Sequence, residues 1–281
     1  MSTVSNVFSK GGGGARFEFD TQTAFMVMML IGAFMPGSEE EIIIRLRQQS
    51  GSLGYTTDDV LLWTKDNTAQ EHRSLIQVKH GMSITKSNEA RIKVLTDAWK
   101  DFNNPALFDK KNDRMIVIVD NLSTKERKHL KELISWAKAK SNQEDFFNEV
   151  TRINAKKEYY DLFETILKEA GFNPSGDELF SFIKCFDIWA FDFGTSASVC
   201  YNNFINLIEM AKAPGTHLVA AEIWNKLFTT ISGSNFKGGS IEWKAIPTGL
   251  TALFNRYYFP GVQKQLLAIN DESKGNIGVD T

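Results

Sequence analysis

The chain has 281 residues, of which 42% are hydrophobic and 12% aromatic, enough apolar side chains for one large globular domain or two small ones. Its 34 acidic and 32 basic side chains give a formal net charge of −2, which excludes a global positive field that would draw the protein to nucleic acid. Any contact with DNA must therefore come from a local basic patch.

The cysteine and histidine content argues against disulfide and zinc frameworks. Cys185 and Cys200 are the only two cysteines, too few for a disulfide scaffold and not spaced as a zinc site. The four histidines have no metal-ligand spacing either. A cytoplasmic protein in a reducing compartment is the simplest expectation.

The N-terminal region is predicted to be a glycine-rich leader followed by a buried helix. Residues 1–14 end in four glycines, which have high chain entropy and no side chains to pack. A helix is predicted over 15–34, ended by Pro36 and Gly37. Its apolar run, 24–35, is shorter than the about 20 residues of a membrane span, so no membrane contact is expected.

The next segments predict strands. A β-branched run predicts a strand over 41–47, and glycines predict a turn over 51–54. The alternating patterns of 60–65 and 74–80, joined by the polar residues 66–73, predict the two strands of a hairpin.

A helix, a buried strand and another helix complete the predicted core. The helix covers 87–102, and the continuous apolar run 115–119 is typical of a strand buried on both faces. A further helix begins at Ser123 or Thr124 and runs towards Lys140. This order of elements predicts an α/β fold with a mixed sheet flanked by helices.

Beyond residue 142 the chain is predicted to be mainly helical. The expected elements are helices over 145–170, 176–184, 196–212 and 217–232, with one strand within 185–193. The predicted organisation is a flexible leader (1–14), a domain (15–210) with its core at 15–140, and a helical extension (211–281) that links to a further module.

Polar residues at one end of the predicted hairpin are the best candidates for chemistry. Side chains two apart in a strand share a face, so Gln77 and Lys79 point the same way, while Val78 packs into the opposite layer. Asp58 and Asp59 point to opposite faces, so only one of them can join this pair. Asp59 directly precedes the apolar run and is preferred, although the pattern alone does not determine the register.

These residue types suit a divalent metal site. Mg²⁺ and Mn²⁺ prefer oxygen ligands, and Mg²⁺ is usually held by one or two carboxylates, with water and phosphate completing the shell. Asp59 and the amide oxygen of Gln77 are the expected ligands, and Lys79 is expected to hold the attacking water or the phosphate. Glu18, in the first turn of the predicted first helix, is a candidate second carboxylate.

Accessory positions lie close to these candidates in the sequence. Gln22 follows Glu18 by one helical turn on the same face, and His80 follows Lys79 directly. An ordinary strand with a solvated polar face is the alternative interpretation of the same pattern.

Several motifs together resemble a known family. They are Gly13-Gly14-Ala15-Arg16-Phe17-Glu18-Phe19, Gly54-Tyr55-Thr56-Thr57-Asp58-Asp59-Val60, Gln77-Val78-Lys79-His80 and Ala98-Trp99-Lys100-Asp101-Phe102. In this order they resemble the N-terminal nuclease domain of bacterial antiphage effectors, found beside SAVED domains in CBASS systems and at the front of antiviral STAND ATPases. The resemblance covers residues 13–102.

The resemblance implies a restriction-endonuclease-like PD-(D/E)xK core and a Mg²⁺-dependent endonuclease acting on double-stranded DNA. It also implies activation by homo-oligomerisation, forced by a sensor, ATPase or SAVED-type module in the same or a partner chain. Asp59, Gln77 and Lys79 match the catalytic positions, with Glu18 a fourth. Gln77 stands where an acidic residue is more familiar, which makes Glu18 more important to the metal site.

A basic segment predicts where DNA would be held. The candidate contacts are Lys86, Lys125, Arg127, Lys128 and Lys131. A solvated helix face is the alternative for this segment. For the whole chain, the alternative function is a catalytically inactive nuclease-fold module that binds DNA or a protein partner through the helical region beyond residue 142.

Overall fold

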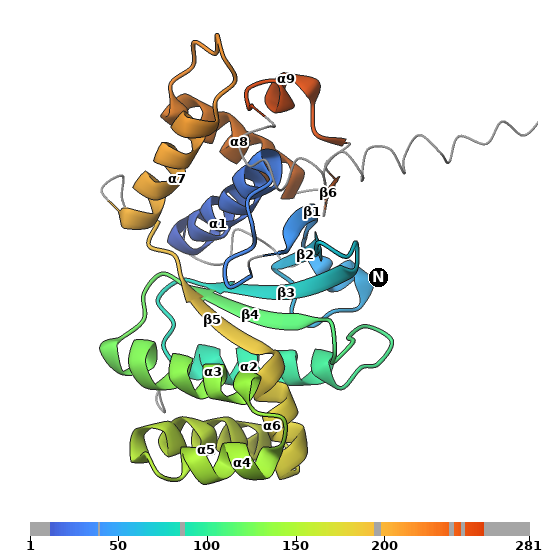
Figure 1. Cartoon of the computed structure of the whole chain (residues 1–281), viewed down its shortest axis with the longest axis vertical. Helices are drawn as coiled ribbons and strands as arrows, with labels where there is room; N and C mark the ends of the chain where they lie inside the picture. The colour runs from blue at the N-terminus through green and yellow to red at the C-terminus, as the bar shows by residue number, and fades with distance from the viewer. Residues whose placement is uncertain are drawn as a thin grey trace, which may run out of the picture.

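The computed structural model describes residues 12–38, 40–84, 88–193, 198–235, 239–242 and 245–255. A six-stranded sheet with the order β5-β4-β3-β2-β1-β6 has helices on both faces (Figure 1). Its strands are β1 (Ile42–Gln48), β2 (Val60–Lys65), β3 (Glu71–Lys79), β4 (Arg114–Val119), β5 (Phe186–Ala190) and β6 (Ser240–Glu242). The predicted α/β class, a mixed sheet flanked by helices, is confirmed.

The sheet is parallel on one side and antiparallel on the other. β3, β4 and β5 run parallel, whereas β2, β1 and β6 are joined by antiparallel pairing, with Val60 opposite Ile76. The carboxyl ends of β3, β4 and β5 therefore lie at one edge of the sheet. Lys79 at the end of β3 is in register with Val119 at the end of β4.

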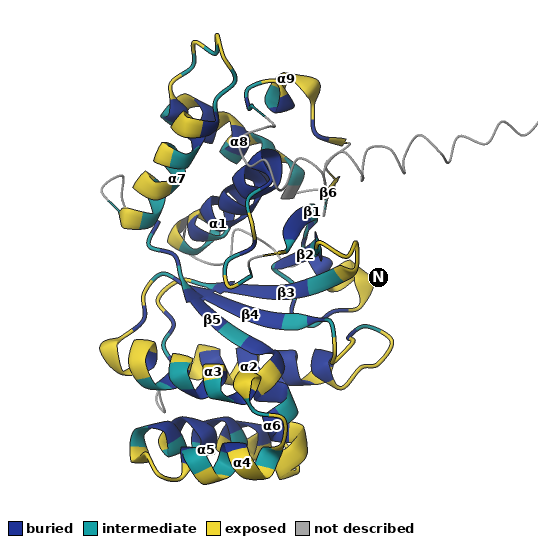
Figure 2. Ribbon diagram, in the orientation of Figure 1, coloured by how far each residue is buried: buried dark blue, intermediate teal, exposed yellow. Residues whose placement is uncertain are grey.

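One face of the sheet is covered by α1 (Gly12–Ile31), α7 (Val199–Ala211) and α8 (Ala220–Asn235) (Figure 1). Residues 24–31 of α1 are all buried, which Figure 2 shows as a dark blue helix between the sheet and its two neighbours. A helix enclosed on all sides is apolar all round. None of the helices in the described ranges is long and apolar enough to cross a membrane.

The bounds of α1 correct two predictions. The helix begins at Gly12, so the leader predicted over 1–14 ends earlier, and Glu18 lies in the second turn, not the first. Glycine weakens a helix by about 0.5–1 kcal/mol per residue, a cost that the burial of the rest of α1 offsets. The helix ends at Ile31, short of the predicted residue 34, because Gly32 adopts the left-handed conformation at φ 68°.

The other face carries α2 (Glu89–Phe102), η3 (Glu126–Leu130) and α3 (Lys131–Ala139). Beyond them, α4 (Gln143–Val150) and α5 (Asn154–Glu169) form an outer layer with α6 (Gly176–Cys185), which leads into β5 (Figure 1). η3 is a single π-helical turn that leads directly into α3, within the helix predicted from Ser123 or Thr124. β5 lies within the strand predicted over 185–193.

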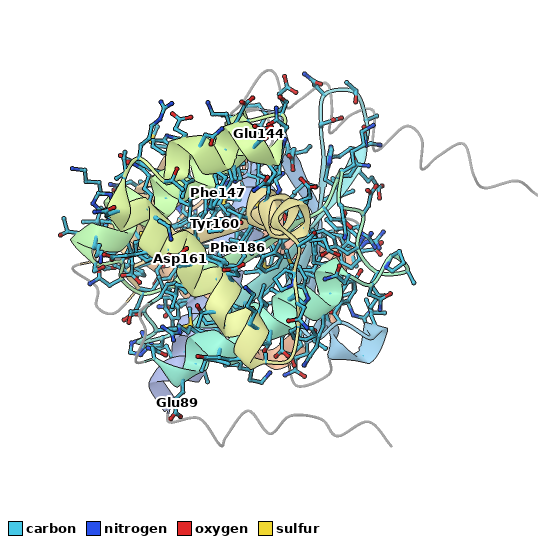
Figure 3. The ribbon with its side chains drawn as sticks, turned by 90° about the horizontal axis from the view of Figure 1, so that it is seen from below. Glu89, Glu144, Phe147, Tyr160, Asp161 and Phe186 are labelled. Carbon is cyan, nitrogen blue, oxygen red and sulfur yellow. The ribbon has the colours of Figure 1, made fainter. Side chains whose placement is uncertain are left out.

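The single helix predicted over 145–170 is wrong, because residues 151–153 separate α4 from α5. The break lets both helices turn aromatic rings towards a shared core. The rings of Phe147 and Tyr160, labelled in Figure 3, come from α4 and α5 and lie 5.3 Å apart between centroids. The helical spacing of apolar residues continues across residues 151–153, so the sequence pattern does not reveal that the chain reverses direction there.

Phe182 is the central ring of the core on the α2 face of the sheet, and its removal is expected to destabilise the protein. It is fully buried and packs against Trp99, Phe102, Phe163 and Phe186. We expect Phe182→Ala to lower the free energy of unfolding by about 3–5 kcal/mol, since it leaves a cavity that the neighbours fill only in part.

Urea denaturation followed by circular dichroism measures this loss. Phe34→Ala is the control, because Phe34 is 41% exposed and its removal is expected to cost less than about 1 kcal/mol. Equal losses in the two variants would contradict the assignment of Phe182 to the core.

The described part of the predicted extension, up to residue 255, is integrated into the same fold. β6 pairs with β1, and Lys212 forms a β-bridge with Phe254. Trp224 of α8 is 2% exposed and belongs to the core cluster that contains α1. No second core separates residues 211–255 from the rest of the described chain.

Candidate active site

The segment that leads into β2 is held in place by α2. The carboxylate of Asp101, 2% exposed, accepts hydrogen bonds from the backbone N–H groups of Thr56 at 2.9 Å and Thr57 at 2.7 Å. It also accepts from the hydroxyl of Thr56 at 2.9 Å, and that hydroxyl is 2.8 Å from the carbonyl of Asp97. These contacts set the direction in which the chain enters the Asp58-Asp59 pair.

Three of the four predicted catalytic residues meet at one oxygen atom. The Oδ2 atom of Asp59 accepts from Nζ of Lys79 at 3.0 Å and from the side-chain amide of Gln77. It also accepts from the backbone N–H of Val78 at 2.8 Å. The side chain of Asp59 is only 12% exposed and that of Lys79 20%, which strengthens their attraction relative to an exposed pair.

The alternation predicted for β3 is confirmed. Leu75 belongs to the core on the α2 face, whereas Val78 packs into the core on the α1 face. Gln77 and Lys79 follow Leu75 by two and four residues, so they lie on the α2 face.

The geometry also distinguishes the two candidate aspartates. Asp59 reaches Gln77 and Lys79, whereas the Cβ of Asp58 lies beside the turn at Gly51, 3.6 Å from where a Cβ on that glycine would be. The carbonyl of Asp58 accepts from the backbone N–H of Ser50 at 2.8 Å. Asp59 is therefore the aspartate placed to share a site with Gln77 and Lys79.

The donor set of Asp59 and Gln77 fits a hard divalent cation. A carboxylate and an amide oxygen are ligands that Mg²⁺ accepts, and water and phosphate complete such a shell. The amide of Gln77 points its nitrogen at Asp59, and a half-turn of that amide presents Oε1 to the same space. Among the described residues no three His, Cys, Asp or Glu side chains gather as a metal site, so a metal here depends on Gln77.

Glu18 approaches from the opposite layer. It lies on α1, and its Oε1 atom accepts from Nε2 of Gln22 at 2.9 Å. Gln22 is fully buried, and its own Oε1 accepts from Nε2 of Gln48 at 2.6 Å. Because Glu18 and the Gln77–Lys79 pair lie on different faces of the sheet, its role as a metal ligand stays a prediction.

Glu18 is the end of a chain of hydrogen bonds between buried polar side chains. Gln48, at the end of β1 and fully buried, donates to the carbonyl of Ile231 at 3.0 Å and accepts from the hydroxyl of Ser234 at 2.7 Å. Sequence reasoning missed Gln48, although Leu46 two residues earlier marks that face of β1 as inward. These hydrogen bonds fix the orientation of the Gln48 amide, which in turn fixes the amide of Gln22. Gln22 is therefore held with its nitrogen towards Glu18.

Asp120 is a second residue that sequence reasoning missed. It follows β4 directly, and its carboxylate accepts from the backbone N–H of Gly81 at 2.7 Å and lies 3.6 Å from Nε2 of His80. The ring of Phe17 is edge-on to His80 at 5.8 Å. Parallel pairing of β3 and β4 brings their carboxyl ends together, and that rule would have predicted the Asp120–His80 contact.

Two of the basic side chains in the predicted DNA-binding segment are already paired within the protein. Lys125 pairs with Glu158 at 2.5 Å, and the guanidinium of Arg127 donates to the carbonyl of Leu122 at 2.9 Å and to Asn121 at 3.0 Å. Lys128 and Lys131 are exposed on η3 and α3. Lys86 lies outside the described residues. DNA binding by this segment stays a prediction.

Asp20, two residues after Glu18, predicts a pH effect on stability. Burial raises the pKa of this carboxyl from 3.8 to about 6, against the opposing charge of Arg16 and a hydrogen bond with Trp224. The folded protein therefore binds a proton that the unfolded chain releases between about pH 4 and pH 6. The free energy of unfolding contributed by Asp20 falls as the pH rises through that window.

Asp20→Asn is expected to remove this dependence. It should raise the free energy of unfolding by about 1–3 kcal/mol at pH 7 and by less than about 1 kcal/mol at pH 4, where the folded carboxyl is neutral and the unfolded one only partly ionised. Urea denaturation of both proteins at pH 4 and pH 7 measures the difference. A constant difference across this range would contradict the assignment.

No protein-family model and no curated protein matches the sequence. The chain is similar to the Moraxella osloensis Cap4 receptor containing a SAVED/CARF domain, with 14% identity and a TM-score of 0.45 over 83% of this chain and 45% of that one. The Acinetobacter baumannii Cap4 receptor, solved with the cyclic trinucleotide 2′3′3′-cAAA, gives 13% identity and a TM-score of 0.43 over 92% and 47%.

The chain spans less than half of the length of these Cap4 receptors. Identities and TM-scores this low carry no functional inference. Function must therefore be argued from the residues of the site.

Proposed function

We propose that this chain is a metal-dependent endonuclease that hydrolyses phosphodiester bonds of double-stranded DNA. The observation that carries the proposal is the convergence of Gln77 and Lys79 on one carboxylate oxygen of Asp59. A carboxylate, an amide and an ammonium at one sheet edge form a set that can hold a hard cation and a phosphate side by side.

Each residue has a distinct role in this proposal. Asp59 and Oε1 of Gln77 would hold Mg²⁺ or Mn²⁺, with Glu18 as a further ligand. A cation held there would supply a nucleophilic water and would neutralise charge on the phosphate. Lys79 orients the water and stabilises the negative charge that develops on the phosphate oxygens. The hydrogen bond from Val78 N–H holds Asp59 in place.

The biological role proposed with this activity is that of an antiphage effector. Its support is the resemblance of residues 13–102 to nuclease domains of such effectors. Cutting would then be switched on when a sensor, ATPase or SAVED-type module brings several copies of the chain together. The net charge of −2 fits such control, since an isolated copy has no global field to concentrate it on DNA.

Cleavage of supercoiled plasmid tests the proposal. The protein is incubated with Mg²⁺, Mn²⁺ or EDTA over a wide range of concentrations, and also as a fusion to a tetrameric coiled coil that forces assembly. We expect nicked and linear products with Mg²⁺ or Mn²⁺, none with EDTA, and a rate that rises steeply with protein concentration. A folded protein that cuts in neither form would overturn the proposal and favour the inactive binding module.

A further inference from the structure

α2 carries a lysine towards the Asp58-Asp59 pair. Asp101 and the carbonyl of Asp97 hold Thr56 and Thr57, so this face of α2 lies along the segment that enters β2. Lys93 precedes Asp97 by four residues and therefore lies on the same face, one turn nearer the start of α2.

The surroundings of Lys93 place it at the solvent side of the site. Its ammonium hydrogen-bonds to Oδ2 of Asp97, and its side chain is 74% exposed. The pKa of Lys93 is raised, mainly by the hydrogen bond with Asp97, then by the charge of Asp97 and those of Asp58 and Asp59. Because Asp97 lies on the face of α2 that contacts Thr56, its hydrogen bond holds the ammonium of Lys93 on the side of the helix that faces the segment entering β2.

Asp97 can release Lys93 without losing a charged partner. Its carboxylate is only 8% exposed, and its other oxygen, Oδ1, is 3.2 Å from Nζ of Lys100. A buried carboxylate left without a cation would destabilise the fold, because its charge would be neither solvated nor paired. Because Lys100 remains, Lys93 is free to turn towards another anion.

We propose that Lys93 is a phosphate-binding residue of the active site, which moves from Asp97 to the DNA backbone next to the scissile phosphate. The identity of the ligand as DNA rests on the proposed function. Lys79, 20% exposed and bound to Asp59, serves the reacting phosphate, whereas the exposed Lys93 holds the strand beside it. Lys93 would strengthen DNA binding in the ground state, while Lys79 acts on the chemical step.

Lys168 provides the control. It is an exposed lysine on α5 that pairs with Glu164 at 2.9 Å, and it has no contact with Asp97. Binding of wild-type protein, Lys93→Ala, Lys93→Arg and Lys168→Ala to a fluorescent DNA duplex is measured in EDTA, which prevents cutting. Titrations at several salt concentrations give the salt dependence of the dissociation constant.

We expect Lys93→Ala to weaken binding about fivefold to tenfold at moderate salt and to reduce the slope of log K against log salt by about 1. Lys93→Arg should restore most of the affinity, and Lys168→Ala should change it by less than about twofold. In the cleavage assay Lys93→Ala should raise KM and leave kcat within about twofold. Circular dichroism and thermal melting confirm that each variant is folded.

Equal affinities and salt slopes for Lys93→Ala and Lys168→Ala would overturn this inference, whether or not the protein cuts DNA. A wild-type protein that binds duplex through Lys93 but does not cut would instead overturn the proposed nuclease function and leave the phosphate site standing. A folded protein that binds no DNA, either alone or as the tetrameric fusion, would overturn both.

Discussion

Lys79→Ala is expected to lower the rate of metal-dependent DNA cleavage about a hundredfold to a thousandfold. The ammonium of Lys79 lies 3.0 Å from Oδ2 of Asp59 in a largely enclosed position, so its charge is placed before the reaction begins. Removing one such preorganised group from an active site typically has an effect of this size. The measurement is the single-turnover rate of plasmid nicking with Mg²⁺ at saturating protein.

Asp59→Asn tests the other member of the Lys79–Asp59 pair. It keeps the shape of the side chain and removes the charge that would hold the metal, so a loss of similar size is expected. In the double variant Lys79→Ala/Asp59→Asn the losses should not add, because residues that act together lose their function together.

Lys168→Ala is the control for a general charge effect. Lys168 is a half-exposed lysine on α5 that pairs with Glu164 at 2.9 Å, and its loss should leave cleavage unchanged. Undiminished cutting by folded Lys79→Ala or Asp59→Asn protein would remove the basis for the proposed active site.

Asp101→Ala is expected to destabilise the protein by about 3 kcal/mol and to impair cleavage as well. The substitution leaves the backbone N–H groups of Thr56 and Thr57 without their acceptor in a buried place, and each such group costs about 1–3 kcal/mol. Asp59 follows Thr57 by two residues, so a displaced segment moves the carboxylate away from Gln77 and Lys79.

Urea denaturation measures the stability, and plasmid cleavage at a temperature where the variant is folded measures activity. Asp101→Asn retains one acceptor oxygen and should lie between wild type and Asp101→Ala in both. Asp161→Ala removes only an exposed ion pair with Lys157 and should cost less than about 0.5 kcal/mol. If Asp101→Ala were as stable as Asp161→Ala, Asp101 would not be the anchor of this segment.

Much of the candidate site was predictable because it depends on local geometry. Alternation along β3 places Gln77 and Lys79 on one face whatever the rest of the fold does. A hairpin with a short connection brings its two strands side by side, so an aspartate at the start of β2 was expected to meet residues at the end of β3. The buried helix over 24–31 was similarly evident from its continuous apolar run.

The errors came from features that local pattern does not encode. The reversal between α4 and α5 exists because Phe146 and Tyr160 pack together, with centroids 6.1 Å apart, and helical periodicity alone continues through it. The start of α1 at Gly12 depends on a helix whose stability comes from its buried part further on. Packing overrides propensity in both places.

The sequence by itself determined the α/β class, the hairpin, and the shared face of Gln77 and Lys79, because the periods of strand and helix are properties of adjacent residues. Only the tertiary structure decided that Asp59, not Asp58, reaches this pair. It also placed Asp120 beside His80, set the face of α2 that carries Lys93 and Asp97 along the segment entering β2, and brought β6 into the sheet. These placements follow from strand register and from contacts between distant segments, where single contacts across the fold outweigh local preference.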